Sequence, residues 1–385
     1  MAQCIIPRTR SISTKLVYLE LKSILMSNLI NRNSSIELLR IISMWMIVFY
    51  HFHTHVLQYG SDAVVFKAVQ IPLHIAVICF VLISGYFGIN ASIKGFSKLF
   101  GKIMFYALAI IIIVVLYDTY SGSQLHYSSD YVNQHPLSKG VVLNCLLFVS
   151  RTPLWFIRSY LFLYIISPFL NEVLANQSKQ ERIQLLIVLG FITIWSDFFR
   201  ADGMGEGKSV LNFAFIYIIG RTINEYQLLY KISLKVNLIS YFTVTILTLV
   251  LFVFFDGTYI DTIIWLLSFK YNGLFCVLSA ILFFILFARF TFQSDLINTI
   301  SASILAVYLI HENPLLNYYI YSIVNAWQYS LSVPMLYIFL VLYSLVIMII
   351  AVLIDKITLP LQKRLSGVIS FALTSLGGEI GLIKK

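Results

Sequence analysis

The sequence is poor in charge and in cysteine. Charged side chains make up 11% of its 385 residues, hydrophobic side chains make up 59%, and the mean hydropathy is +0.87. An average soluble domain has about 25% charged residues, so this chain has too few to cover the surface of a soluble globule. The scarcity excludes a soluble enzyme and a disordered chain. The four cysteines stand singly, with no CxxC pair. We therefore expect neither a disulfide framework nor a bound metal.

The sequence contains many long runs of apolar residues. Runs near 20 residues can cross about 30 Å of hydrocarbon as helices, and their continuity is unlike the alternating pattern of a membrane β-barrel. We predict an all-α integral membrane protein with about ten transmembrane helices. Two shorter apolar stretches, 141–149 and 260–269, are expected to be re-entrant or interfacial. The predicted helices cover residues 36–56, 71–90, 101–118, 154–174, 183–199, 210–220, 236–255, 273–288, 300–323 and 333–354.

The basic residues predict the orientation of these helices. The formal net charge is +10, and the predicted loops on the side of the N-terminus hold roughly three times as many Lys and Arg residues as the others. Both termini are therefore expected in the cytoplasm and the helices in the plasma membrane. The expected division is a cytoplasmic or interfacial segment (1–35), a transmembrane domain (36–355) and a cytoplasmic tail (356–385). Basic loops touch anionic lipid headgroups, so we expect membrane lipids rather than nucleic acid as partners.

The first predicted helix carries ionisable residues, which in a membrane usually face a cavity or a partner. His51 follows Arg40 by eleven residues, so both project from one face, separated by about 16 Å along the axis. This places Arg40 near the cytoplasmic surface and His51 at mid-membrane or beyond. Glu37 precedes Arg40 by three residues and can pair with it. The alternatives are a snorkelling anchor for Arg40 and a hydrogen-bonded interfacial side chain for His51.

A second polar group lies in the predicted helix 300–323. His311, followed by Glu312 and Asn313, stands near the middle of that helix. The helix runs in the same direction as the first one, so His311 and His51 can reach a similar depth. A neutral imidazole is well suited to take a proton from a hydroxyl group near neutral pH. These residues together indicate a polar tunnel through the membrane.

Four segments, in order, resemble membrane acyltransferase family 3, and the resemblance runs from about residue 36 to residue 355. Each segment alone is loose, and their order on this helical frame gives them specificity. They are the Glu37-x2-Arg40-x10-His51 spacing, Phe80-x3-Ser84-Gly85-Tyr86-Phe87, Pro153-Leu-Trp155-Phe156 with Tyr160, Tyr164 and Pro168, and Tyr308-Leu-Ile-His311.

The resemblance implies the transfer of an acyl group, usually acetyl, from cytoplasmic acyl-CoA to a sugar hydroxyl. The sequence is most similar to the branch that decorates bacterial surface polysaccharides, so the acceptor is expected to be a cell-surface or lipid-linked glycan. His51 would be the general base or the acyl acceptor, with Arg40 at the CoA end of the donor. The other implied site residues are Glu37 and His311 for catalysis and Ser84, Gly85, Tyr86 and Trp155 for substrate or donor binding. Arg158 stands near the outer end of the predicted helix 154–174, where it could contact a lipid-linked phosphate or satisfy backbone carbonyl groups.

One family feature is missing. Where many members have an Arg-x2-Arg pair after the second helix, this chain has Lys94, Lys98 and Lys102. Their spacing puts them on one helical face, where they could bind phosphates as point charges or be ordinary cytoplasmic loop charges. The segment 119–153 is expected to be an outer loop that either takes part in acceptor binding or is a structured lid with interfacial tyrosines. The alternative function is a secondary transporter or flippase for a lipid-linked sugar or polysaccharide, which also uses intramembrane His and Arg residues.

Overall fold

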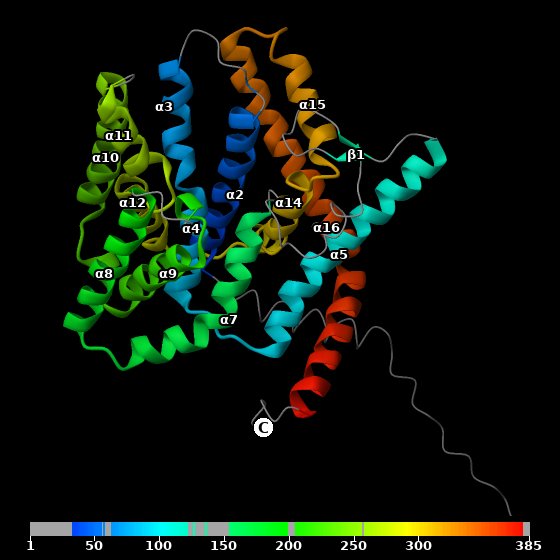
Figure 1. The fold of residues 1–385 in the computed structure, drawn as a ribbon, viewed down its shortest axis with the longest axis horizontal. Coiled ribbons are helices and arrows are strands. Elements are labelled where there is room, and N and C mark those ends of the chain that lie inside the picture. Colours follow the sequence, from blue (N-terminus) through cyan, green and yellow to red (C-terminus); the bar gives the residue numbers. More distant parts are fainter. Residues whose placement is uncertain are drawn as a thin grey trace, which may run out of the picture.

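The computed structural model describes residues 33–55, 57, 63–121, 126–127, 135–136, 154–198, 205–255 and 258–379. Nearly all of these are helical (Figure 1). A short antiparallel pair, β1 (His126–Tyr127) with β2 (His135–Pro136), is the exception. The helices are α2 (Ser34–His55), α3 (Ala63–His74), α4 (Ala76–Phe87), α5 (Ile93–Ser121), α7 (Trp155–Ala175), α8 (Lys179–Phe198), α9 (Val210–Glu225), α10 (Leu234–Phe255), α11 (Tyr259–Phe269), α12 (Leu274–Ala288), α13 (Asp295–Ser301), α14 (Ile304–His311), α15 (Asn317–Trp327) and α16 (Val333–Glu379).

The all-α membrane class is confirmed. Six helical stretches within the described residues are long and apolar enough to cross a bilayer. The total of about ten spans and the cytoplasmic position of the termini stay predictions. The six stretches are Ser34–His55, Val65–Phe87, Ile93–Ser121, Leu234–Phe255, Thr262–Ala288 and Val333–Leu376.

Two predicted helices are interrupted. The helix expected over 300–323 is wrong as a continuous element, because α14 ends at His311 and α15 begins only at Asn317. Pro314 lacks a backbone N–H and disfavours helical geometry at the residue before it, Asn313. The side chain of Asn313 accepts a hydrogen bond from the backbone N–H of Leu315 (3.0 Å), which fixes the turn. The second predicted helix is similarly divided between α3 and α4, with Pro72 shortly before the division.

Other boundaries also differ. The apolar stretch 260–269 is α11, which residues 270–273 separate from α12; by length and composition, most of α11 and all of α12 together make up the candidate spanning stretch Thr262–Ala288. Helix α16 continues through the predicted domain boundary at residue 355 and ends at Glu379. In Figure 1 its last part extends away from the other helices. The segments 16–30 and 141–149 lie outside the described residues.

Helix α2 lies at the centre of the assembly (Figure 1), where α3, α4, α12, α13, α14 and α16 pack against it. Beside it, α4 and α9 approach each other closely. A Cβ atom on Gly85 would lie 2.2 Å from the carbonyl oxygen of Tyr217, and one on Gly220 would lie 2.5 Å from that of Leu82. Small residues of this kind let membrane helices pack backbone to backbone. The contact fixes α4 against the bundle.

Candidate functional site

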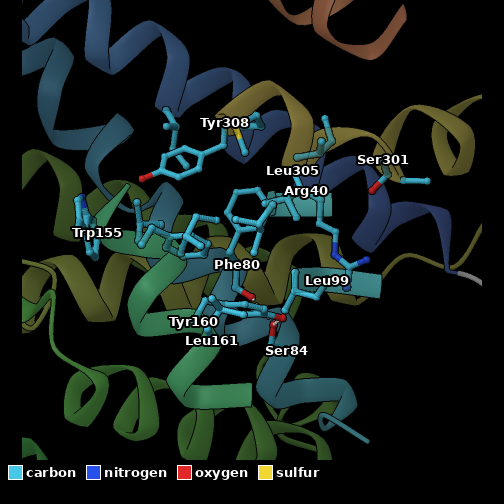
Figure 2. A pocket seen from close by; sticks show the side chains of 18 of the residues that line it. Arg40, Phe80, Ser84, Leu99, Trp155, Tyr160, Leu161, Ser301, Leu305 and Tyr308 are labelled. Atoms are coloured by element: carbon cyan, nitrogen blue, oxygen red, sulfur yellow. Dashed lines mark hydrogen bonds between the residues drawn. The ribbon is translucent and has the colours of Figure 1, made fainter. Parts of the chain in front are cut away.

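A cavity of about 270 Å³ lies among α2, α4, α5, α7, α13 and α14. Its wall is largely apolar, with side chains such as Met44, Phe80 and Leu305. Arg40 and His51 of α2 both border it, as the spacing of the first helix predicts. Figure 2 shows Arg40 at one end of the cavity and Trp155 at the opposite end. The cavity is thus an apolar passage with a cation at one end and an aromatic ring at the other.

The arginine end is held by an acidic partner. Glu37 and Arg40 form an ion pair with a distance of 3.0 Å between Oε1 and Nη1. The hydroxyl of Ser301 on α13 donates a hydrogen bond to Glu37, whose side chain is buried. Arg40 keeps 31% of its side chain exposed. Glu37 does not border the cavity itself. Its carboxylate instead holds the guanidinium of Arg40 at the cavity wall.

Four polar side chains meet farther along α2, around His51. The Nδ1 atom of His51 lies 2.9 Å from Oε1 of Glu312 and 3.1 Å from Nε2 of His311. Tyr321 on α15 donates its hydroxyl hydrogen to Oε1 of Glu312 at 2.6 Å. His311, Glu312 and Tyr321 are fully or almost fully buried, and His51 is partly exposed toward the cavity. The interruption after α14 therefore places a carboxylate directly against the histidine of α2.

The hydrogen-bond partners determine which ring nitrogens carry protons. Nδ1 of His311 lies 2.7 Å from the carbonyl oxygen of Val307, and because a carbonyl only accepts, this nitrogen is the donor. In a neutral His311 ring Nε2 is then an acceptor. Nδ1 of His51, which faces this acceptor and Glu312, must carry the proton. In the neutral state of His51 this leaves Nε2 as the basic nitrogen.

The same three residues could in principle hold a metal ion. Ligand atoms of His51, His311 and Glu312 lie within 4.8 Å of one another. Two histidines with one carboxylate are a known ligand set for catalytic zinc. However, the two short distances from Nδ1 of His51 are those of direct hydrogen bonds. A metal ion would need that nitrogen deprotonated, so it would compete with the hydrogen-bonded arrangement.

Polar groups also occur on the wall between the two ends. The hydroxyl of Ser84 donates to the carbonyl oxygen of Phe80, and its oxygen lies 3.0 Å from the hydroxyl of Tyr160 on α7. Since the single hydrogen of Ser84 is used by Phe80, Tyr160 is the donor in this second contact. Both Ser84 and Tyr160 border the cavity. They form a small polar strip in an apolar wall (Figure 2).

Two residues expected beside Ser84 lie elsewhere. Gly85 is on the face of α4 that contacts α9, so its small size serves helix packing rather than the cavity. The ring of Tyr86 contacts Phe87 and Phe284, and Tyr86 does not border the cavity. The reason is helical geometry, because adjacent residues point about 100° apart.

The basic residues that were expected to bind the donor or substrate also lie in different surroundings. Lys94 and Lys98 of α5 are exposed, while Lys102 points into the bundle and forms an ion pair with Asp355 of α16 at 3.0 Å. Asp355 also accepts hydrogen bonds from Tyr106 and Gln362. Arg158 of α7 is half-buried and is not among the residues that border the cavity. Most of the segment 119–153 lies outside the described residues.

A family model described as an acyltransferase domain matches residues 33–353. The chain belongs to membrane acyltransferase family 3. The matched range contains every residue that borders the cavity, together with His311, Glu312 and Tyr321. Neither a curated protein nor a solved structure matches this acyltransferase.

Sequence patterns did not indicate every polar residue at the centre of the acyltransferase. Glu312 stands beside His311 in the sequence, and a carboxylate in an apolar segment is a signal in itself, but nothing local shows that it contacts His51. Tyr321 gives no signal, because tyrosine is common in membrane helices and at their ends. Tyr160 belongs to one of the family-like segments, but its contact with Ser84 joins residues far apart in the sequence, as does that of Glu312 with His51, so only the folded chain brings these pairs together.

Proposed function

We propose that this acyltransferase moves an acyl group, acetyl in the simplest case, from acyl-CoA to a hydroxyl group of a cell-surface or lipid-linked glycan. The observation that carries the proposal is the contact of Glu312 with His51 beside a cavity that also reaches Arg40. The carboxylate orients the imidazole and stabilises the imidazolium that forms when the ring takes up a proton. The cavity provides an enclosed place for a thioester next to that ring.

In the first form of the mechanism, His51 is a general base. Nε2 of His51 removes the proton of the acceptor hydroxyl while its oxygen attacks the thioester carbonyl. The carbon–sulfur bond then breaks, and the thiolate of CoA takes the proton from the imidazolium. Proton transfer by a well-placed side chain contributes about 10²- to 10⁴-fold to the rate of such reactions. The polar strip of Ser84 and Tyr160 lies on the same cavity and is a candidate to stabilise the charge on the carbonyl oxygen.

In the second form, His51 carries the acyl group. Nε2 attacks the thioester carbonyl, the carbon–sulfur bond breaks and CoA leaves as thiolate. An acyl-imidazolium with its proton on Nδ1 remains until the acceptor hydroxyl attacks it; the carbon–nitrogen bond then breaks, and the proton of the hydroxyl passes through the freed Nε2 to the thiolate of CoA. The protonated Nδ1, held by Glu312, makes Nε2 the free nucleophile in this scheme as well. Trapping the protein with labelled acetyl-CoA and no acceptor distinguishes the two forms, since only the second leaves the label covalently on His51.

The end of the cavity at Arg40 is proposed to receive the CoA part of the donor. A guanidinium presents a rigid, permanently charged set of donors that suits phosphate oxygens. Lys94 and Lys98 are exposed on α5, whose Leu99 and Ile103 border the cavity, and they add positive charge on that side. The proposal needs no resident cofactor besides the acyl-CoA substrate, and it places the enzyme in the plasma membrane among anionic lipids.

The direct test uses protein purified in detergent and cells that carry each variant as the sole copy. The wild type is expected to bind acetyl-CoA and to support O-acetylation of surface glycans, which is measured as an added acetyl mass. His51→Ala should abolish acetylation and keep acetyl-CoA binding. His53→Gln is the matched control, because His53 lies on another face of α2 and contacts Tyr337 at 3.0 Å. Normal acetylation by His51→Ala, or no binding of acetyl-CoA by the wild type, would refute the proposal.

A further inference from the structure

An aromatic ring borders the end of the cavity opposite Arg40, and a charged pair lies beside that ring. Trp155, the first residue of α7, borders the cavity there (Figure 2). The ammonium group of Lys208 lies 5.7 Å from the centre of the Trp155 ring. Lys208 also pairs with Glu206 at 3.2 Å, and these two side chains are 39% and 47% exposed. The pair is thus accessible to solvent and adjacent to the cavity.

The backbone that carries this pair has an uncommon conformation. Gly205, Glu206 and Gly207 have φ angles of 48°, 58° and 77°. Glycine adopts positive φ freely, but for a residue with a side chain the left-handed region is uncommon and costs free energy. Such conformations persist where surrounding contacts hold them, and they occur often at ligand sites. The left-handed conformation of Glu206 is therefore of the kind that is often found at ligand sites.

Several contacts hold this loop against neighbouring helices. The backbone N–H of Tyr271 donates to the carbonyl oxygen of Glu206 (3.1 Å), and the amide of Asn212 donates to that of Gly207 (2.8 Å). The hydroxyl of Ser159 on α7 donates to the carbonyl oxygen of Lys208 (2.6 Å). Tyr271 itself borders the cavity, and its ring is tilted against that of Trp155 with the ring centres 5.1 Å apart. The loop is rigidly joined to the wall of the cavity.

The aromatic ring is also near the histidines at this end of the bundle. Tyr271, whose ring centre is 5.1 Å from that of Trp155, stacks on His74 at the end of α3 with ring centres 4.5 Å apart. His55 lies one turn beyond His51, and the centres of their rings are 5.4 Å apart. A molecule held between Trp155 and Lys208 would thus lie on the side of His51 that is away from Arg40.

We infer that Trp155, Lys208 and Glu206 form the binding subsite for the acceptor saccharide. The inference rests on the proposed function and extends it. The face of an indole ring packs against the apolar C–H face of a sugar, and paired cationic and anionic groups can donate to and accept from its hydroxyls. Because Lys208 and Glu206 balance each other's charge, the subsite suits an uncharged sugar ring. Trp155 then serves the acceptor and not the donor.

The test compares acceptor use with donor binding in the full-length protein. The variants are Lys208→Ala, Glu206→Gln and Trp155→Ala, and Lys235→Ala is the control, an exposed lysine at the start of α10. Acetyl-CoA affinity is measured on purified protein, and glycan acetylation is measured by mass in cells with each variant as the sole copy. Thermal melting in detergent identifies a variant that fails to fold; Lys208→Ala and Glu206→Gln change half-exposed side chains and should fold normally.

We expect glycan acetylation to fall about tenfold or more in Lys208→Ala and Glu206→Gln, the effect of losing a hydrogen bond to a charged group. Acetyl-CoA affinity should stay within about twofold of the wild type, and Lys235→Ala should behave as the wild type. Full acetylation by both loop variants, or a matching loss of acetyl-CoA affinity, would overturn the acceptor subsite. If the wild type itself binds no acetyl-CoA, the proposed function fails instead, so the two failures are distinguishable.

Discussion

The carboxylate of Glu312 lies 2.9 Å from Nδ1 of His51, and this contact joins the turn after α14 to α2. Tyr321 donates to the same carboxylate oxygen from the other side. A histidine oriented by a buried carboxylate has a fixed tautomer and a defined direction for its second nitrogen. The proposed chemistry depends on this orientation.

Replacing Glu312 by Gln keeps the size of the side chain and removes its charge. We expect kcat to fall by about 10²- to 10⁴-fold, because the amide neither fixes the tautomer of His51 nor stabilises its imidazolium. The KM for acetyl-CoA should change little, since Glu312 does not border the cavity. Steady-state kinetics on purified protein check this, with Glu172→Gln as a control at an exposed carboxylate. A near-normal kcat in Glu312→Gln would show that the contact has no part in catalysis.

Metal removal distinguishes the hydrogen-bonded arrangement from a metal site. We expect treatment with a strong chelator to leave activity unchanged, and elemental analysis to find no stoichiometric metal in the purified protein. The reason is that Nδ1 of His51 already makes direct contacts with Glu312 and His311. Loss of activity on chelation, with recovery on adding one particular metal ion, would instead assign these residues as ligands.

Lys102 is expected to stabilise the fold rather than bind the donor. Its ammonium group pairs with Asp355, and the two side chains are only 14% and 3% exposed. Asp355→Asn leaves the lysine charge without its partner and should cost about 3 kcal/mol or more of stability. A lowered melting temperature in detergent with unchanged acetyl-CoA affinity is the expected result for Asp355→Asn. If Lys102→Met binds acetyl-CoA more weakly at unchanged stability, Lys102 contributes to donor binding instead.

Two glycines should respond oppositely to alanine. Gly85→Ala puts a Cβ atom 2.2 Å from a backbone oxygen of α9, so α4 and α9 must separate and the folded yield should fall sharply. Gly367→Ala meets nothing within 4 Å in helix α16 and should gain about 0.5–1 kcal/mol of helix stability. Size-exclusion profiles and melting temperatures of the two variants provide the comparison. Equal tolerance of both changes would contradict the close packing of α4 on α9.

The sequence was most informative where the relation is local. Helical periodicity alone predicts that Arg40 and His51 share a face, and both border one cavity. Composition predicts the membrane class. The partner of Lys102 was beyond prediction, since Asp355 lies on a helix far along the chain. The contact of Glu312 with His51 does not follow from a continuous helix over 300–323, because it depends on the turn that Pro314 imposes. Gly85 and Tyr86 follow Ser84 directly in the sequence, but neighbouring residues of a helix point in different directions, so they do not share its place at the cavity.

The contact between His51 and the residues that follow α14 also bears on biosynthesis. His51 is synthesised early in translation, whereas its carboxylate partner Glu312 emerges only after most of the matched domain has been made. In the proposed mechanism, a nascent chain still attached to the ribosome before that point has no oriented imidazole and so cannot consume acyl-CoA. The completed enzyme would then become reactive only when α2 and the segment after α14 have come together, so that activity would indicate correct assembly.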